Sequence, residues 1–187
     1  MTEPVRDDAD LLAALRREPA LMGLLYERHA PDVHRYLARR AGGAAADDLL
    51  ADVFVAALAA RKRVVPHESG SALPWLYGIA RNILRRYLRQ SARANPPSGP
   101  PGLDWDAVDS RLDAQSQQAQ LRKAIDVLSE SERDVLLLVA WEGLTPAEAG
   151  AALGISAVAA RSRLHRARLR AQNVLADRSL ERKENLT

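Results

Sequence analysis

Residues 144–170 read LTPAEAGAALGISAVAARSRLHRARLR, and this stretch decides the fold of the C-terminal half of the chain. Thr145 is placed to cap a helix, and Glu148, three residues later, completes a capping box. Gly154 predicts where this short helix ends, because glycine adopts the left-handed conformation without a steric penalty. Ser156 is placed to cap a second helix. Two helices joined by so tight a turn predict a helix-turn-helix unit, whose second helix normally enters the major groove of DNA.

The second helix of this unit has an apolar face and a basic face. At about 100° per residue, one stripe carries Leu164 and three alanines, Ala160, Ala167 and Ala171, which predicts that this face packs inward. The opposite face has short or hydrogen-bonding side chains at its centre and arginines on its flanks, without an acidic residue from 161 through 170. Such a face suits base edges at its centre and phosphates at its flanks, although a solvated basic surface is the alternative. The candidate DNA-contacting residues are Val158, Arg161, Ser162, Arg163, His165 and Arg166.

Composition narrows the class of protein. The chain has 187 residues, enough for one domain or two small ones, and a net charge of only +3. Aromatic residues make up 4% and alanine, leucine and arginine dominate, which predicts an all-α fold. The absence of cysteine excludes disulfides and thiolate metal sites. No apolar run is long enough to span a membrane, and no signal-peptide pattern opens the chain, so we expect a cytoplasmic protein without membrane insertion.

The sequence contains no pattern of residues typical of an enzyme active site. The four histidines lack the spacing of a metal site, and there is no glycine-rich loop for a phosphate. Adjacent Asp47 and Asp48 point about 100° apart on a helix, so they do not share a proton or a metal easily. We expect no catalytic residue, no metal and no cofactor.

A Pro- and Gly-rich run divides the chain in two. Residues 95–102 read NPPSGPPG, and neither a helix nor a strand tolerates that density of proline and glycine. We therefore expect one helical domain over 10–91, a flexible linker over 92–113 and a second helical domain over 114–176. Residues 1 to about 10 are predicted to be disordered, and the charged tail after Leu175 is predicted to fray.

Helical spacing of apolar residues recurs inside both domains. In the first domain we expect a break or kink at Pro31, a helix from Asp47 and a longer helix over 74–90 after a loop at 61–73. This longer helix carries arginines every four residues on one face, at Arg81, Arg85 and Arg89, and is expected to bury Leu76, Ile79, Ala80, Ile83 and Tyr87. In the second domain, a further capping box is expected where residues 129–132 read SESE.

Three stretches resemble the extracytoplasmic-function sigma factors of the sigma-70 family. They read DDLLADVF at 47–54, PWLYGIARN at 74–82, and EGLTPAEAG through SRLHRAR at 142–168. The resemblance implies two small all-α domains, sigma region two and sigma region four, joined by the linker. It also implies a sigma factor that gives RNA polymerase its promoter specificity and helps to open the duplex without catalysing a reaction.

The resemblance implies roles for particular residues. The helix at 47–54 would bind the β′ clamp helices of core polymerase through Asp48, Leu49, Asp52 and Phe54, although Phe54 has an equal claim to the core. The minus-ten element would be recognised and melted by His67, Ser69, Ser71, Asn82 and Arg85. The second helix of the helix-turn-helix unit would read the minus-thirty-five element. The implied partners are core polymerase, including its β flap, and promoter DNA, with an anti-sigma factor as a further candidate.

Two other classes of protein stay open on the sequence alone. A stand-alone helix-turn-helix regulator would dimerise on a palindrome and would not need the helices of the first domain. A protein-interaction module that sequesters a sigma factor would not need a helix flanked by arginines. Run-off transcription with core polymerase separates both classes from a sigma factor.

Overall fold

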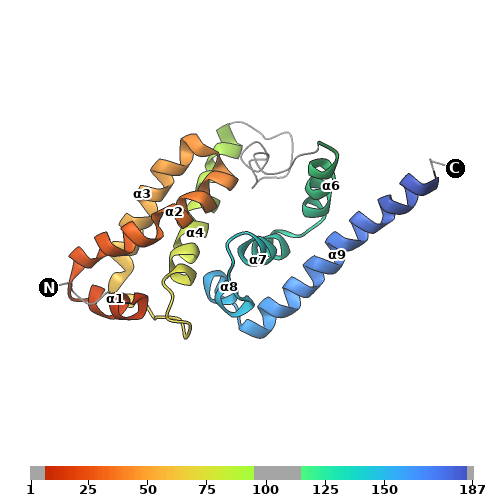
Figure 1. The fold of residues 1–187 in the computed structure, drawn as a ribbon. Helices are drawn as coiled ribbons and strands as arrows, with labels where there is room; N and C mark the ends of the chain where they lie inside the picture. Colours follow the sequence, from red (N-terminus) through yellow and green to blue (C-terminus); the bar gives the residue numbers. More distant parts are fainter. Residues whose placement is uncertain (1–6, 95–114, 185–187) are drawn as a thin grey trace. The chain divides into compact units, whose positions relative to one another are not determined.

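The computed structural model describes residues 7–94 and 115–184, and its regular structure in these two ranges is entirely helical (Figure 1). The chain divides between Ala107 and Val108 into two compact units. The prediction of two helical domains is confirmed. Residues 95–114, which hold most of the predicted linker, lie outside the described residues, so the linker and its bounds stay a prediction.

Unit 1 is built on three long helices, α2, α3 and α4, that pack against one another. Its core includes Val33 and Leu37 from α2, Val53 from α3 and Leu76 from α4, none of which exposes any surface. A short helix, α1, precedes them and packs against α2. In chain order the elements are α1 (Asp8–Leu15), η1 (Pro19–Leu21), α2 (Met22–Ala41), α3 (Gly43–Ala60), η2 (Arg61–Arg63) and α4 (Leu73–Ala94).

The N-terminal segment is more ordered than the sequence predicted. Helix α1 begins at Asp8, inside the stretch expected to be disordered, because the Asp7 side chain accepts a hydrogen bond of 2.8 Å from the Asp10 N–H and caps the helix. Three leucines then anchor α1, since Leu11, Leu12 and Leu15 are at most 1% exposed. Residues 1–6 lie outside the described residues.

The long helices also extend beyond the predicted bounds. Helix α2 runs through Pro31 without a break, because the proline lies on an exposed face where water can satisfy the carbonyl that loses its partner. Helix α3 starts at Gly43 rather than Asp47, directly after Gly42 ends α2 with a φ of 82°. In α4, Tyr77 and Leu84 are buried while Ile79 and Tyr87 are only half-buried, so its inward face is rotated slightly from the predicted one.

Unit 2 contains the predicted helix-turn-helix. Its helices are α6 (Gln115–Asp126), α7 (Glu130–Ala140), α8 (Pro146–Leu153) and α9 (Ala157–Glu184), and α9 packs against the other three. Thr145 and Glu148 form the predicted capping box, and Gly154 adopts the left-handed conformation with φ 68°. The Ala159 N–H donates to the Ser156 hydroxyl at 3.1 Å, which confirms the second cap. Helix α9 continues past Leu175, where fraying was predicted.

Helices α8 and α9 approach each other closely at Gly150. A Cβ atom at this position would lie 3.0 Å from the Ile155 carbonyl oxygen and 3.3 Å from the Ala160 Cβ. Gly150 and Ala160 are both buried, and Leu164 and Ala167 follow Ala160 on the inward face of α9, as the sequence predicted. The small residues therefore set the distance between the two helices.

We predict that Gly150→Val lowers the free energy of unfolding by about 1–3 kcal/mol, because the added side chain overpacks this contact. Denaturant unfolding followed by circular dichroism measures the change. Gly23→Val is the control, since a Cβ at Gly23 in α2 would meet no atom within 4 Å. Equal stability of the two variants would show that the approach of α8 to α9 is not tight.

Candidate functional site

The first candidate surface is the outward face of α9 in unit 2. Val158 is 67% exposed, and Arg161, Ser162, His165 and Arg166 are also exposed, whereas Arg163 is half-buried. Burial of Ala160, Leu164 and Ala167 on the opposite side fixes the rotation of the helix. The structure therefore brings the predicted DNA-contacting residues together on one face, with Arg163 at its edge.

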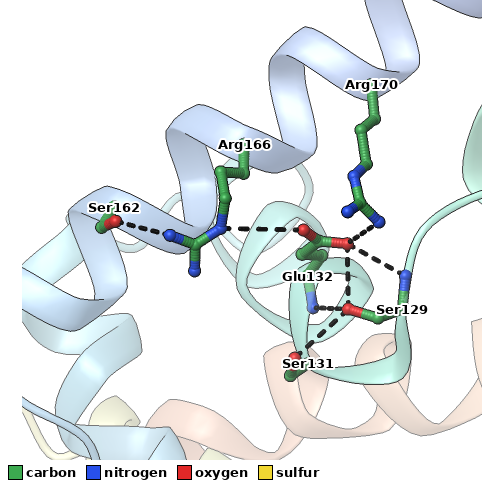
Figure 2. Close-up of polar contacts among 6 residues, drawn as sticks. All are labelled: Ser129, Ser131, Glu132, Ser162, Arg166 and Arg170. Carbon is green, nitrogen blue, oxygen red and sulfur yellow. Dashed lines mark hydrogen bonds and ion pairs between the residues drawn. The ribbon is translucent and has the colours of Figure 1, made fainter.

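A buried carboxylate, that of Glu132, lies between α7 and α9, and Arg166 and Arg170 of α9 reach toward it (Figure 2). Glu132 is 5% exposed and completes the predicted capping box of α7, accepting hydrogen bonds from the Ser129 N–H at 3.1 Å and the Ser129 hydroxyl at 2.9 Å. The same carboxylate accepts a hydrogen bond of 3.1 Å from Arg170 on α9. The sequence identified Glu132 only as a capping residue, and its contact with α9 was missed because the partners are 38 positions apart.

Arg166 also takes part in this cluster. Its Nε lies 3.9 Å from the Glu132 Oε1, and its Nη1 donates to the Ser162 hydroxyl at 2.8 Å (Figure 2). The guanidinium is thus oriented by contacts within the protein, and part of its charge is offset by Glu132. Arg166 consequently has a structural role beside the DNA contact that the sequence predicted, whereas Arg161 is the simpler probe of DNA binding.

The surroundings of Glu132 set its charge. Burial raises the pKa of the Glu132 carboxyl, but the hydrogen bonds from Ser129 and the positive charges of Arg170 and Arg166 outweigh burial. The pKa therefore lies below its ordinary value of 4.5. Because the pKa is lowered on folding, the charged carboxylate stabilises the fold above pH 4.5, and this contribution is lost as the pH falls through the lowered pKa.

We predict that Glu132→Gln lowers the free energy of unfolding by about 1 kcal/mol at neutral pH, because glutamine keeps an acceptor for Ser129 but loses the charge. Both arginines are half-exposed, so solvent screening limits the effect. The variant should also lose less stability than the wild type between pH 4.5 and pH 3. Unfolding at both pH values measures this, with exposed Glu130→Gln as the control. An unchanged pH dependence would contradict the assignment.

The second candidate surface is the loop that precedes α4 in unit 1. Gly70, with a φ of 76°, donates its N–H to the His67 carbonyl at 2.9 Å and closes a tight turn. The Ser69 N–H donates to His67 Nδ1 at 3.1 Å, and the Ser69 hydroxyl lies 2.9 Å from the same nitrogen. Since a backbone N–H only donates, Nδ1 is an acceptor and the neutral ring carries its proton on Nε2. Ser71 accepts from the Leu73 N–H at 3.2 Å at the start of α4.

Two further predicted residues lie along α4. Asn82 is exposed and Arg85 is half-buried, and three positions separate them, so they share one side of the helix. Asn82 follows Leu73 by nine residues, about 14 Å along the helix axis. The structure therefore brings His67, Ser69 and Ser71 together in the loop, whereas Asn82 and Arg85 lie apart from them, further along α4.

The third candidate surface is the outward face of α3. Asp48 and Asp52 are exposed, and Val55, which is 69% exposed, follows them at helical spacing. Leu49 and Phe54 are only 5% and 6% exposed. The Phe54 ring packs edge-on against Tyr26 of α2, with 4.8 Å between the ring centroids.

This burial separates the predicted polymerase-binding residues into two exposed and two buried side chains, and their role in docking stays a prediction. Leu49 and Phe54 are core residues in this conformation, and the core alternative for Phe54 is the one that its burial supports. The sequence missed Val55, although its position three residues after Asp52 places it on the same face. The surface that α3 presents is therefore Asp48, Ala51, Asp52 and Val55, which we call the α3 face.

None of the described helices is long and apolar enough to cross a membrane. Within residues 7–94 and 115–184, no cluster of three or more His, Cys, Asp or Glu side chains is arranged to hold a metal ion.

Comparison with known proteins assigns both units. The family model for sigma-70 region 2 matches residues 25–94, and that for sigma-70 region 4 matches residues 118–170. The RNA polymerase sigma factor CarQ of Myxococcus xanthus is 34% identical over 160 residues, which cover 84% of this chain and 90% of CarQ. The ECF RNA polymerase sigma factor SigL of Mycobacterium tuberculosis is 31% identical over 165 residues, with coverage of 84% and 90%. The chain belongs to the ECF sigma-70 family.

This sigma factor also resembles its relatives in three dimensions. A structure of CnrH in complex with the cytosolic domain of CnrY matches it with a TM-score of 0.60 at 25% identity, covering 91% of this chain and 97% of CnrH. Membership of the family makes the protein an RNA polymerase sigma factor that acts in transcription initiation. The presence of region 2 beside region 4 excludes a stand-alone helix-turn-helix regulator.

Proposed function

We propose that this sigma factor docks on core RNA polymerase through the α3 face and contacts one promoter at two elements. The observation that carries the proposal is that unit 1 exposes an acidic and apolar helix face together with a preformed loop, while unit 2 exposes a separate basic helix. Docking and DNA contact thereby use different surfaces. A protein with this division of surfaces assists initiation in the cytoplasm and needs no catalytic residue of its own.

Unit 1 is proposed to recognise and open the minus-ten element. The neutral His67 ring carries a donor at Nε2. The hydrogen bonds from the Gly70 N–H to the His67 carbonyl and from the Ser69 N–H to His67 Nδ1 hold the turn before DNA arrives. Asn82 lies about 14 Å along the axis of α4 from Leu73, and Arg85 lies about one turn further on. At about 3.4 Å per nucleotide, this distance corresponds to roughly four nucleotides of one strand. The loop and the helix would then contact different bases of the same element.

Unit 2 is proposed to bind the minus-thirty-five element through α9 and to dock on the β flap of polymerase. Ser162 and His165 lie at the centre of the exposed face, where they suit base edges, and Arg161 lies on its flank. An anti-sigma factor is proposed as a further partner. The match to CnrH, which was solved with the cytosolic domain of CnrY, supports this proposal.

Run-off transcription tests the function directly. Core polymerase from the same bacterium is combined with this sigma factor and a library of genomic promoter fragments, and the transcripts are sequenced. We expect a small set of start sites that requires the sigma factor. Transcription without dependence on the added protein, or with no promoter preference, would contradict the proposal.

We predict that the double variant Asp48→Lys with Asp52→Lys loses assembly with core polymerase, because it reverses the charge at the centre of the α3 face. Val55→Glu should weaken assembly as well, since it places a charge on the exposed apolar position. Co-purification with core polymerase measures both. The control is Glu27→Lys with Asp32→Lys on α2, which makes the same change in net charge elsewhere in unit 1. A folded α3 variant that assembles like the wild type would contradict docking at this face.

We predict that Arg161→Ala weakens promoter binding by the holoenzyme without loss of stability, because its side chain lies on the exposed flank of α9. A lost phosphate contact would reduce the slope of log affinity against log salt by about 0.9. A lost base contact would relax preference at one position by about 1–3 kcal/mol. Exposed Lys123→Ala on α6 is the charge-matched control. Identical promoter binding by both variants would exclude Arg161 from the interface.

A further inference from the structure

Helix α1 holds both ends of the loop between α3 and α4. At the start of the loop, Arg16 Nη2 donates a hydrogen bond of 2.8 Å to the Val64 carbonyl. At its end, Asp8 Oδ2 accepts a hydrogen bond of 2.9 Å from the Ala72 N–H. Val64 and Ala72 are buried, at 2% and 0% exposed, whereas most residues between them are exposed. These two hydrogen bonds therefore lie on either side of the segment that contains His67. Arg16 is 48 positions from Val64 in the sequence, and Asp8 is 64 positions from Ala72.

The Asp8 side chain is itself held in place by two residues of α2. The Asp8 side chain is 11% exposed, and its two oxygens lie 2.5 Å from Arg28 Nη1 and 2.7 Å from His29 Nε2. Burial raises the pKa of the Asp8 carboxyl, but the Ala72 N–H, Arg28 and His29 together lower it below its ordinary value of 3.8. The carboxylate is charged at neutral pH, so its hydrogen bond to the backbone of the loop is a strong one.

Packing keeps α1 in place beside the loop. Leu11, Leu12 and Leu15 are buried in the core of unit 1, which fixes the helix relative to α2. The Ala9 Cβ would lie 3.9 Å from a Cβ at Gly70, so α1 also approaches the tight turn of the loop. Helix α1 lies outside the matched sigma-70 region 2, which begins at residue 25.

We propose that α1 positions the loop for minus-ten recognition, with Asp8 and Arg16 as the positioning residues that fix its two ends. A loop with fixed ends samples fewer conformations, so less conformational entropy is lost when bases bind to it. Discrimination between bases also benefits, because the donors of the loop are held at defined positions. This inference rests on the proposed contact between the loop and the minus-ten element.

The test measures discrimination rather than binding alone. Holoenzyme is titrated with two single-stranded oligonucleotides, one carrying a minus-ten element found by the run-off selection and one with a base of that element replaced. The ratio of the two affinities is the readout. A loss of folded protein lowers both affinities in parallel and leaves this ratio unchanged, whereas a misplaced loop reduces it.

We expect Asp8→Ala and Arg16→Met each to reduce the ratio by about fivefold, the scale of the net contribution of one typical hydrogen bond. Asp8→Asn should reduce the ratio less than Asp8→Ala does, because the amide oxygen of asparagine can still accept a hydrogen bond from the Ala72 N–H. Affinity for core polymerase should be unchanged, because the α3 face is not altered. Asp10→Asn and Arg17→Met are matched controls on or next to α1, both at exposed positions and neither with a hydrogen bond from its side chain to the loop in the structure.

The possible results separate this inference from the proposed function. Wild-type holoenzyme without discrimination between the oligonucleotides would overturn the role of the loop and the inference together. Discrimination by the wild type that persists in both Asp8→Ala and Arg16→Met would overturn the inference alone. A parallel loss for both oligonucleotides would also overturn it, since α1 would then only stabilise the fold. The inference is supported if Asp8→Ala and Arg16→Met reduce the ratio while their affinity for core polymerase is unchanged, and if Asp8→Asn restores part of the ratio.

Discussion

The surface of unit 2 that we propose to contact DNA depends on the close approach of α8 to α9. Gly150 leaves no room for a Cβ between the Ile155 carbonyl and Ala160, so α9 is held at one distance and one rotation. This rotation buries Leu164 and Ala167, and it turns the polar and basic side chains to solvent. A helix that slipped around its axis would expose apolar residues to DNA and bury arginines, which is unfavourable on both counts.

Each unit reinforces its arrangement with one buried carboxylate. Glu132 in unit 2 and Asp8 in unit 1 both accept a hydrogen bond from a backbone N–H. Glu132 also lies beside Arg166 and Arg170, and Asp8 lies beside Arg28 and His29. Both have lowered pKa values, despite burial that acts in the opposite direction. A buried charge is tolerated only when it is paired and hydrogen-bonded, so each carboxylate favours one arrangement of its partners. In each unit one of those partners belongs to, or adjoins, a surface that we propose to contact DNA.

Local signals in the sequence predicted the part of the fold that local physics determines. The capping boxes at Thr145 and Ser129 and the left-handed Gly154 depend on residues within a few positions of one another, and all three are confirmed. The predicted break at Pro31 was wrong, because the proline lies on an exposed face of α2 where water can satisfy the freed carbonyl. The same reasoning also failed for residues 8–10, where the local cap by Asp7 was missed and the other contacts that hold α1 reach Ala72 and Val64, far along the chain.

The residues that form the candidate surfaces were harder to predict from the sequence than the helices were. A family resemblance identifies a helix, but a stretch such as DDLLADVF contains residues of both faces, and only burial separates Asp48 from Leu49. The role predicted for Arg166 was likewise incomplete. Its pairing with Glu132 joins α9 to α7, and the sequence gives no sign of a side-chain contact between distant positions. Periodicity gives the inward face of α4 only approximately, since Tyr77 and Leu84 are buried whereas the predicted Ile79 and Tyr87 are only half-buried.

Charge is distributed so that the proposed partners do not compete for one surface. The net charge of +3 is the small difference between 27 basic and 24 acidic residues, so the protein as a whole attracts DNA only weakly. The acidic α3 face repels phosphates and favours a basic partner surface, whereas the arginines of α9 do the opposite. Under the proposed docking through α3, DNA contact by either unit becomes part of one assembly, and its effective concentration rises. Weak DNA binding by each unit then suffices for a promoter complex, while the undocked protein has little tendency to occupy DNA.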